Sequence, residues 1–233
     1  MDTELVALQI GLKKVARKVV KENELDKYNT LIKQLNLTST HNNETNYLYI
    51  SKDRQSAELA NQYETELSKP LNYTKENFVA KIEEYFKAQE ELQNKLGELF
   101  GYPKCCIAEF IRFNKSEFLK VHTAYNDNNE KQETIPNYAI NTYNNTQNKE
   151  QFNFLLNNLC KRHLISHFPC SYECKESIRY AKKIFANLNQ EQKIETIKNL
   201  RKSLLVINEE DFVNIDSKTL SQNTEIMKNF YFK

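Results

Sequence analysis

The chain has 233 residues and a formal net charge of +2, with 33 lysines and arginines against 31 aspartates and glutamates. This near-balance argues against general electrostatic attraction to nucleic acid or to an anionic membrane surface. No stretch approaches the ~18 apolar residues of a membrane-spanning helix, and the acidic start of the chain lacks a signal-peptide core. We therefore expect a cytoplasmic protein without a membrane partner. Its five cysteines, an odd number, would stay reduced.

The composition favours helices over a sandwich of short strands. Only three glycines and four prolines interrupt the chain, and residues of high helix propensity are abundant. The chain is also long enough to bury a sizeable core. We predict a mainly α protein with a small β component, α+β or α/β in class, that forms a single compact helical domain. Within it, an N-terminal helical segment (residues 1–40) precedes a main domain (residues 41–233).

The first part of the chain alternates helical patterns with one strand pattern. Apolar residues at near-helical spacing predict an amphipathic helix over residues 3–23 and a second helix over residues 25–35. The polar residues 38–45 are expected to form a loop, whereas residues 46–51 have the aromatic and β-branched content of a strand. This strand leads into a predicted helix over residues 53–67, which would complete half of a βαβ unit.

Residues 75–99 carry the clearest helical pattern in the chain, with Thr74 as its expected N-cap and Gly101 as its stop. Pro103 can then start another helix. Residues 126–148 are rich in Asn, Gln, Asp and Thr and are predicted to form a polar surface loop. The remaining expected elements are a helix over residues 152–164 with Cys160 on its apolar side, helices over residues 170–187 and 190–202, and strands at residues 204–207 and 211–213.

Four of the five cysteines fall in two short motifs, and a histidine accompanies the second. The first motif is Gly101-Tyr102-Pro103-Lys104-Cys105-Cys106, and the second is His167-Phe168-Pro169-Cys170-Ser171-Tyr172-Glu173-Cys174. Thiols and imidazole at such spacing are what a soft metal ion or an iron–sulfur cluster requires. The candidate ligands of one metal site are therefore Cys105, Cys106, His167, Cys170 and Cys174.

Both motifs are expected at helix starts, where free N–H groups and a partial positive charge favour thiolate over thiol. Pro103 would place Cys105 and Cys106 in a first turn. A helix that begins at Pro169 would place Cys170 and Cys174 on one face, whereas an N-cap at Ser171 would remove Cys170 from that face. In either case, two segments sixty residues apart must meet to form the site.

The spacing of the cysteines narrows the type of metal site. The chain lacks the paired Cys-x2-Cys of a zinc ribbon and the Cys-x3-Cys-x2-Cys of a radical-SAM protein, where Ser177 takes the place of the last cysteine. It also lacks a phosphate-binding glycine loop, Gly-x-Ser-x-Gly and His-Glu-x-x-His. Zinc and a four-iron cluster both stay open, whereas thiolate ligands exclude magnesium and calcium.

The two motifs together resemble the domain-of-unknown-function family 483, an uncharacterised and mainly archaeal family. The resemblance rests on residues 101–106 followed by Phe110, and on residues 167–174 followed by Ser177 and Ala181. The segment Tyr49-Ile50-Ser51-Lys52-Asp53 resembles the upstream part of the family, so that about residues 45–190 are covered. The resemblance implies that the cysteines and His167 form one site, and it implies no particular activity.

Three functions remain open at the level of sequence, and no catalytic residue is assigned. The first is an iron–sulfur or zinc protein with a redox or catalytic role, which is favoured because His167 would be a ligand beyond four thiolates. The second is a binding or regulatory module that contains structural zinc. The third is a metal-free thiol redox protein, which the Cys170–Cys174 spacing disfavours. Structural alternatives also exist, since a cysteine can be a small core residue and His167 can cap a helix.

Overall fold

The computed structural model describes residues 2–69, 78–128, 138–147, 153–158, 163–200, 204–207, 211–213 and 227–230. Across these ranges the protein is mainly α with a small β component, as predicted. Contacts between Cα atoms divide the chain into one unit of Asp2–Ile107 and another that begins at Ala108, and the two are described separately. None of the helices in the described ranges combines the length and apolar character needed to cross a membrane.

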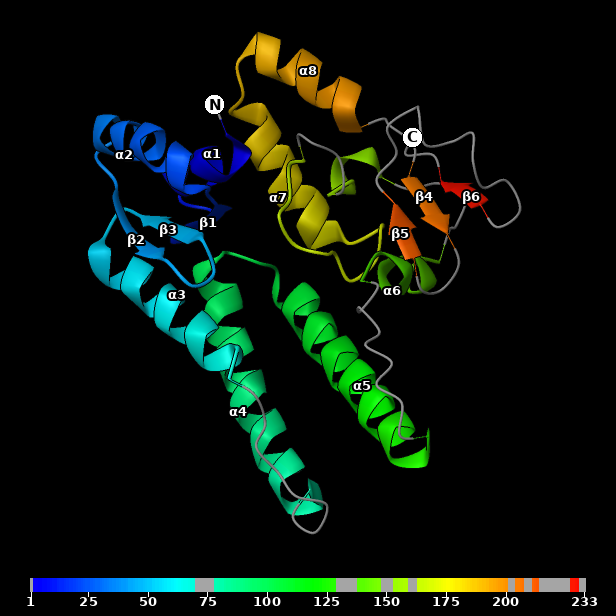
Figure 1. Ribbon diagram of the computed structural model, residues 1–233. Coiled ribbons are helices and arrows are strands. Elements are labelled where there is room, and N and C mark those ends of the chain that lie inside the picture. Colours follow the sequence, from blue (N-terminus) through cyan, green and yellow to red (C-terminus); the bar gives the residue numbers. More distant parts are fainter. Residues whose placement is uncertain are drawn as a thin grey trace. The chain divides into compact units, whose positions relative to one another are not determined.

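The first unit consists of a small antiparallel sheet and the helices that cover it (Figure 1). The strand order is β1–β3–β2, so β3 is central, and Ser51 lies opposite both Val15 and Thr38. The elements in chain order are α1 (Thr3–Gln9), β1 (Val15–Val19), the 3-10 turn η1 (Glu22–Glu24), α2 (Leu25–Gln34), β2 (Thr38–Asn42), β3 (Tyr47–Ser51), α3 (Arg54–Leu67) and α4 (Phe78–Leu99).

The sheet separates two apolar clusters, as the two-residue period of a strand requires. Leu48 and Ile50 face a cluster with α1 and α2, whereas Tyr49 faces a cluster with α3 and the end of α4. In β1, Ala16 joins the first cluster and Val15 joins the second. The predicted segment 1–40 therefore shares a core with β3, and its boundary at residue 40 stays a prediction.

Three predictions for this unit are wrong. The expected helix over residues 3–23 ends at Gln9, because the chain turns at Gly11 (φ +75°) and continues as β1. The apolar residues of that stretch fit the strand period as well as the helix period, and the packing of both strand faces decides between them. The expected loop over residues 38–45 contains β2, which pairs antiparallel with β3, so the βαβ expectation is also wrong. The helix expected at residues 25–35, the strand at 46–51 and the helix at 53–67 are confirmed.

The second unit contains most of α5 (Lys104–Asn128) and the elements that follow it. These are α6 (Tyr138–Asn144), the 3-10 turn η2 (Phe154–Leu156), α7 (Lys175–Ala186), α8 (Gln190–Leu200) and the antiparallel strands β4 (Leu204–Ile207), β5 (Asp211–Val213) and β6 (Met227–Phe230), in the order β5–β4–β6. The helix expected at residues 190–202 and the two strands expected after it are confirmed.

The polar stretch 126–148 is only partly a loop, because α5 extends to Asn128 and α6 forms over Tyr138–Asn144. The helix expected over residues 152–164 is also wrong in its described part, where only the short turn η2 forms. The predictions for Thr74 and Cys160 lie outside the described residues.

Candidate metal centre

The first cysteine motif follows a tight turn between α4 and α5. Gly101 ends α4 with φ +67°, and a Cβ atom at this position would overlap the carbonyl oxygen of Leu12. Next to this close approach of the two segments, the Lys14 amide donates a hydrogen bond to the Leu99 carbonyl oxygen at 2.9 Å. Glycine is required here because it accepts a positive φ and leaves room for the other chain segment. The predicted helix stop is confirmed.

Pro103 starts α5, as predicted, and its carbonyl oxygen accepts the amides of Cys106 and Ile107 at 2.9 and 3.0 Å. Cys105 and Cys106 therefore lie in the first turn of this helix. Tyr102 packs between neighbours: its ring centroid is 5.5 Å from that of Phe100, and the Lys13 ammonium lies 5.8 Å from it. These contacts favour a packing role for Tyr102 over one as a catalytic acid.

The second motif lies in a loop and not in a helix, so the alternative in which a helix from Pro169 places Cys170 and Cys174 on one face is wrong. The helix α7 begins at Lys175, with Cys174 as its N-cap residue. The reason is that Cys174 closes a turn, in which its amide donates to the Ser171 carbonyl oxygen at 3.1 Å. The partial positive charge of the α7 N-terminus still lies next to Cys174.

Two threonines near α6 hold this loop through hydrogen bonds to its backbone. The Thr142 hydroxyl donates to the Pro169 carbonyl oxygen at 2.8 Å, and the Tyr172 amide donates to the Thr146 hydroxyl at 2.9 Å. Both threonines are 1% exposed, so each bond satisfies a buried polar group. Both threonines fall in the stretch predicted to be a polar loop, in which Tyr138 was an available signal for a packed helix.

Aromatic rings connect α5 to α6, and α6 to the loop of the second motif. Tyr138 of α6 stacks against Phe110 of α5 at 5.0 Å and against Phe168 of the loop at 5.1 Å, and it meets Phe113 edge-on at 5.1 Å. Such stacked and edge-on pairs contribute roughly 0.5–1.5 kcal/mol each beyond the area that they bury.

Glu109 adds polar contacts between α5 and α6. Its carboxylate accepts hydrogen bonds from the Arg112 guanidinium on its own helix and from the side-chain amides of Asn141 and Asn145, both at 2.8 Å. The bond from Arg112 is the largest cause that holds the pKa of this carboxyl below its usual range. Burial opposes it, and the bonds from the two asparagines lower the pKa further.

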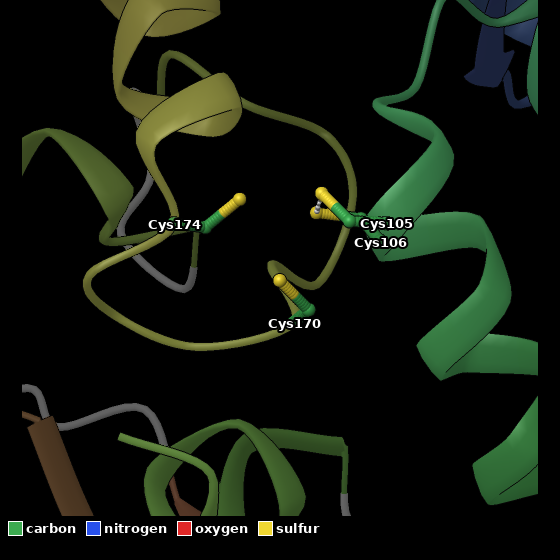
Figure 2. Close-up of side chains that lie close together, drawn as sticks. All are labelled: Cys105, Cys106, Cys170 and Cys174. Carbon is green, nitrogen blue, oxygen red and sulfur yellow. Dashed lines mark hydrogen bonds between the residues drawn. The ribbon is translucent and has the colours of Figure 1, made fainter. Parts of the chain in front are cut away.

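The four motif cysteines converge in space. The sulfurs of Cys105, Cys106, Cys170 and Cys174 all lie within 4.8 Å of one another, and those of Cys105 and Cys106 are 3.9 Å apart. Figure 2 shows the pair projecting from the start of α5 toward the two thiols of the loop. Four thiols at such distances could hold a metal ion, since tetrahedral zinc with bonds of ~2.3 Å places its sulfur ligands about 3.8 Å apart.

His167 is not part of this group of four, and its predicted part as a ligand stays a prediction. The residue is 5% exposed, and its Nε2 atom lies 2.9 Å from the hydroxyl oxygen of Ser177 in α7. Its ring meets Tyr180 edge-on with centroids 5.8 Å apart. Its carbonyl oxygen accepts a hydrogen bond from the Asn158 side chain at 3.0 Å. His167 thus links the loop to α7 one turn from Cys174.

Comparison with protein-family models gives a match. A family model described as "Protein of unknown function (DUF483)" matches residues 58–205, a range that contains the four converging cysteines and His167. No curated protein and no solved structure matches the chain.

Proposed function

This chain belongs to the family described as Protein of unknown function (DUF483), and we propose its function from the geometry of the four cysteines. The protein binds one soft metal ion, preferentially zinc, through the thiolates of Cys105, Cys106, Cys170 and Cys174. The ion joins the first turn of α5 to the loop before α7. The observation that carries this proposal is the mutual distance of at most 4.8 Å among the four sulfurs.

The short sulfur–sulfur distances favour one ion over a four-iron cluster. Ligands that share a single tetrahedral ion lie close together, whereas the thiolates of a four-iron cluster bind different irons and lie farther apart. A divalent ion with four thiolates carries a formal charge of −2, so nearby positive charge stabilises it. The helix N-termini of α5 and α7 supply part of this charge, and Lys104 and Lys175 are adjacent to the cysteines in the chain.

The proposed ligand set also bears on the role of the ion. Four thiolates fill the tetrahedral coordination that is typical of structural zinc, and they leave no position for substrate. The expectation of a redox or catalytic role depended on His167 as an additional ligand, and the hydrogen bond between His167 and Ser177 supports a different role for this residue. We therefore favour the structural reading, with an iron–sulfur cluster as the second candidate for the same thiols.

The deciding experiment is metal analysis of protein purified without oxygen. We expect a colourless protein with one zinc per chain by elemental analysis, and cobalt substitution should give the visible spectrum of tetrahedral thiolate coordination. A brown protein that contains iron and inorganic sulfide would instead support the cluster. Protein that stays metal-free after reconstitution with zinc and with iron would refute both candidates.

The zinc affinities of single-residue variants can distinguish the metal ligands from neighbouring residues. Cys174→Ser and Cys106→Ser each replace a buried thiol, so we expect each to weaken zinc affinity by more than about tenfold, the scale for loss even of an outer-shell partner. His167→Gln is the informative control, because the amide can keep a hydrogen bond to Ser177. Unchanged zinc affinity in this variant supports the ligand set of four thiols, and loss of the zinc would restore His167 to that set.

A further inference from the structure

The four converging thiols are unequally exposed. Cys105 is exposed and Cys170 is half-buried, whereas Cys106 and Cys174 are only 2% and 7% exposed. The sulfur of Cys105 nevertheless lies within the group and is 3.9 Å from that of Cys106. The site therefore combines buried cysteines suited to holding an ion with Cys105, the most exposed of the four residues.

We propose that Cys105 is an acceptor of small alkyl groups, an inference that rests on the metal site proposed above. Its thiolate, held in the metal centre, attacks a saturated carbon that carries a leaving group able to depart as an anion. Cys106, Cys170 and Cys174 keep the ion in place and are not alkylated at the same rate.

The chemistry follows from the ligand set. A thiol that coordinates a metal ion is already deprotonated, and thiolate is the nucleophilic form of cysteine. The centre has a net charge of −2, which leaves electron density on sulfur for attack on a soft carbon electrophile. The sulfur lone pair forms the new S–C bond while the bond to the leaving group breaks, and that group departs with the electron pair. No proton is transferred and no oxidant or reductant is consumed.

The product differs from the starting centre in charge. The alkylated sulfur is a neutral thioether, so the centre changes from −2 to −1 and loses one strong ligand. Lys104 and Lys175 are exposed and adjacent in sequence to Cys105 and Cys174, which favours a leaving group that departs as an anion. Such a reaction occurs once per site, so the expected behaviour is that of a stoichiometric acceptor and not of a turnover catalyst.

The test uses the full chain with zinc loaded and its metal content measured beforehand. The probes are iodomethane and iodoacetamide at a small excess, and peptide mass analysis locates the added group over time. A Cys160→Ser background removes the one cysteine outside the group of four. We expect one alkyl group per chain, attached to Cys105 about tenfold faster than to Cys170, because only Cys105 combines exposure with coordination.

The test variant is Cys105→Ser, and the Cys160→Ser background is its matched control. Cys105→Ser should abolish the fast modification, which the background protein shows at Cys105. First modification at Cys170, Cys106 or Cys174 would overturn the proposal, as would loaded protein that resists both probes while stripped protein reacts. The metal measurement is independent of these outcomes: zinc without selective alkylation refutes only the acceptor role, and absence of any metal refutes the proposed centre as well.

Discussion

At the scale of single residues, Gly101 is the position that most constrains the first cysteine motif. Both its positive φ and the closeness of the Leu12 carbonyl oxygen exclude a side chain. We expect Gly101→Ala to lower the free energy of unfolding by about 3 kcal/mol or more, because left-handed strain of ~1–2 kcal/mol adds to the backbone overlap.

Gly11→Ala is the matched control for this substitution. Gly11 also has a positive φ, +75°, but no atom lies within 4 Å of a Cβ built there. Its cost should therefore be the strain alone, about 1–2 kcal/mol. Urea denaturation of the two variants measures the difference, and equal destabilisation would contradict the role assigned to the contact with Leu12.

A buried ion pair gives a second prediction at this scale. The Lys13 ammonium lies 2.5 Å from a Glu4 carboxylate oxygen, and the two side chains are 0% and 7% exposed. Lys13→Met removes an ion-pair partner of the buried Glu4 carboxylate and should cost about 3–5 kcal/mol. Lys18→Met breaks the pair with Asp2, whose side chains are 20% and 28% exposed, and should cost about 1 kcal/mol or less. Chemical denaturation of both variants would show a similar cost only if burial of the first pair were unimportant.

At the scale of elements, the contact between α5 and α6 should depend on pH through Glu109. Because its pKa lies below the usual range in the folded protein, ionised Glu109 stabilises the fold above the usual carboxyl pKa. This stabilisation is lost as the pH falls through the usual pKa, about 4.3, toward the lower folded value.

The measurement compares the parent protein with Glu109→Gln by denaturation between about pH 7 and pH 3, a range that spans the carboxyl pKa. The parent should be more stable at neutral pH, and the difference should shrink as the pH falls below about 5. Comparison at each pH cancels effects common to both proteins, such as proton competition for bound metal. A difference that stays constant down to pH 3 would exclude the carboxylate as its source.

The same elements show what can be inferred from sequence. Helices such as α2, α3 and α8 are predictable because a long apolar stripe and strong helix formers agree there. The strands β1 and β2 are not predictable, because Val15–Val19 fits both periods and Thr38–Asn42 is polar. Pairing with β3 and, for β1, packing on both faces select the strands. Likewise α6 is short and polar, and contacts of Tyr138 with Phe110 and Phe168 stabilise it.

The candidate site also has one part that could be predicted from sequence and one part that could not. The spacing of the four cysteines identifies them as candidate ligands. The turn at Gly101, with Pro103 after it, predicts the start of α5. The loop conformation of the second motif could not be predicted, because it depends on hydrogen bonds to its backbone from Thr142 and Thr146, which are buried and distant in sequence. A local sequence pattern does not show hydrogen bonds that form between distant segments in the folded protein.

At the scale of the whole molecule, the proposed ion would act as a cross-link between segments more than sixty residues apart in the chain. Metal bound only by the folded state adds about 4 kcal/mol at a thousand times its dissociation constant. For a chain of this size, that corresponds to roughly 10 °C in the midpoint of thermal unfolding.

Calorimetry before and after removal of the metal with a strong chelator tests this expectation, and re-addition of zinc should restore the midpoint. Magnesium serves as the control, because hard cations do not bind thiolates well and should restore nothing. An unchanged midpoint after verified removal would mean that the ion does not contribute to the stability of the fold.

The close packing of Gly101 on Leu12 has a practical consequence for handling this protein. The cysteine pair begins four residues after Gly101, which lies in a turn that packs directly against the stretch around Leu12. Zinc occupancy should then report the folding quality of a preparation, since a sample misfolded near Leu12 would incorporate little metal although every cysteine is intact. A metal assay on freshly made protein would thus rank expression conditions by the fraction of correctly folded chain.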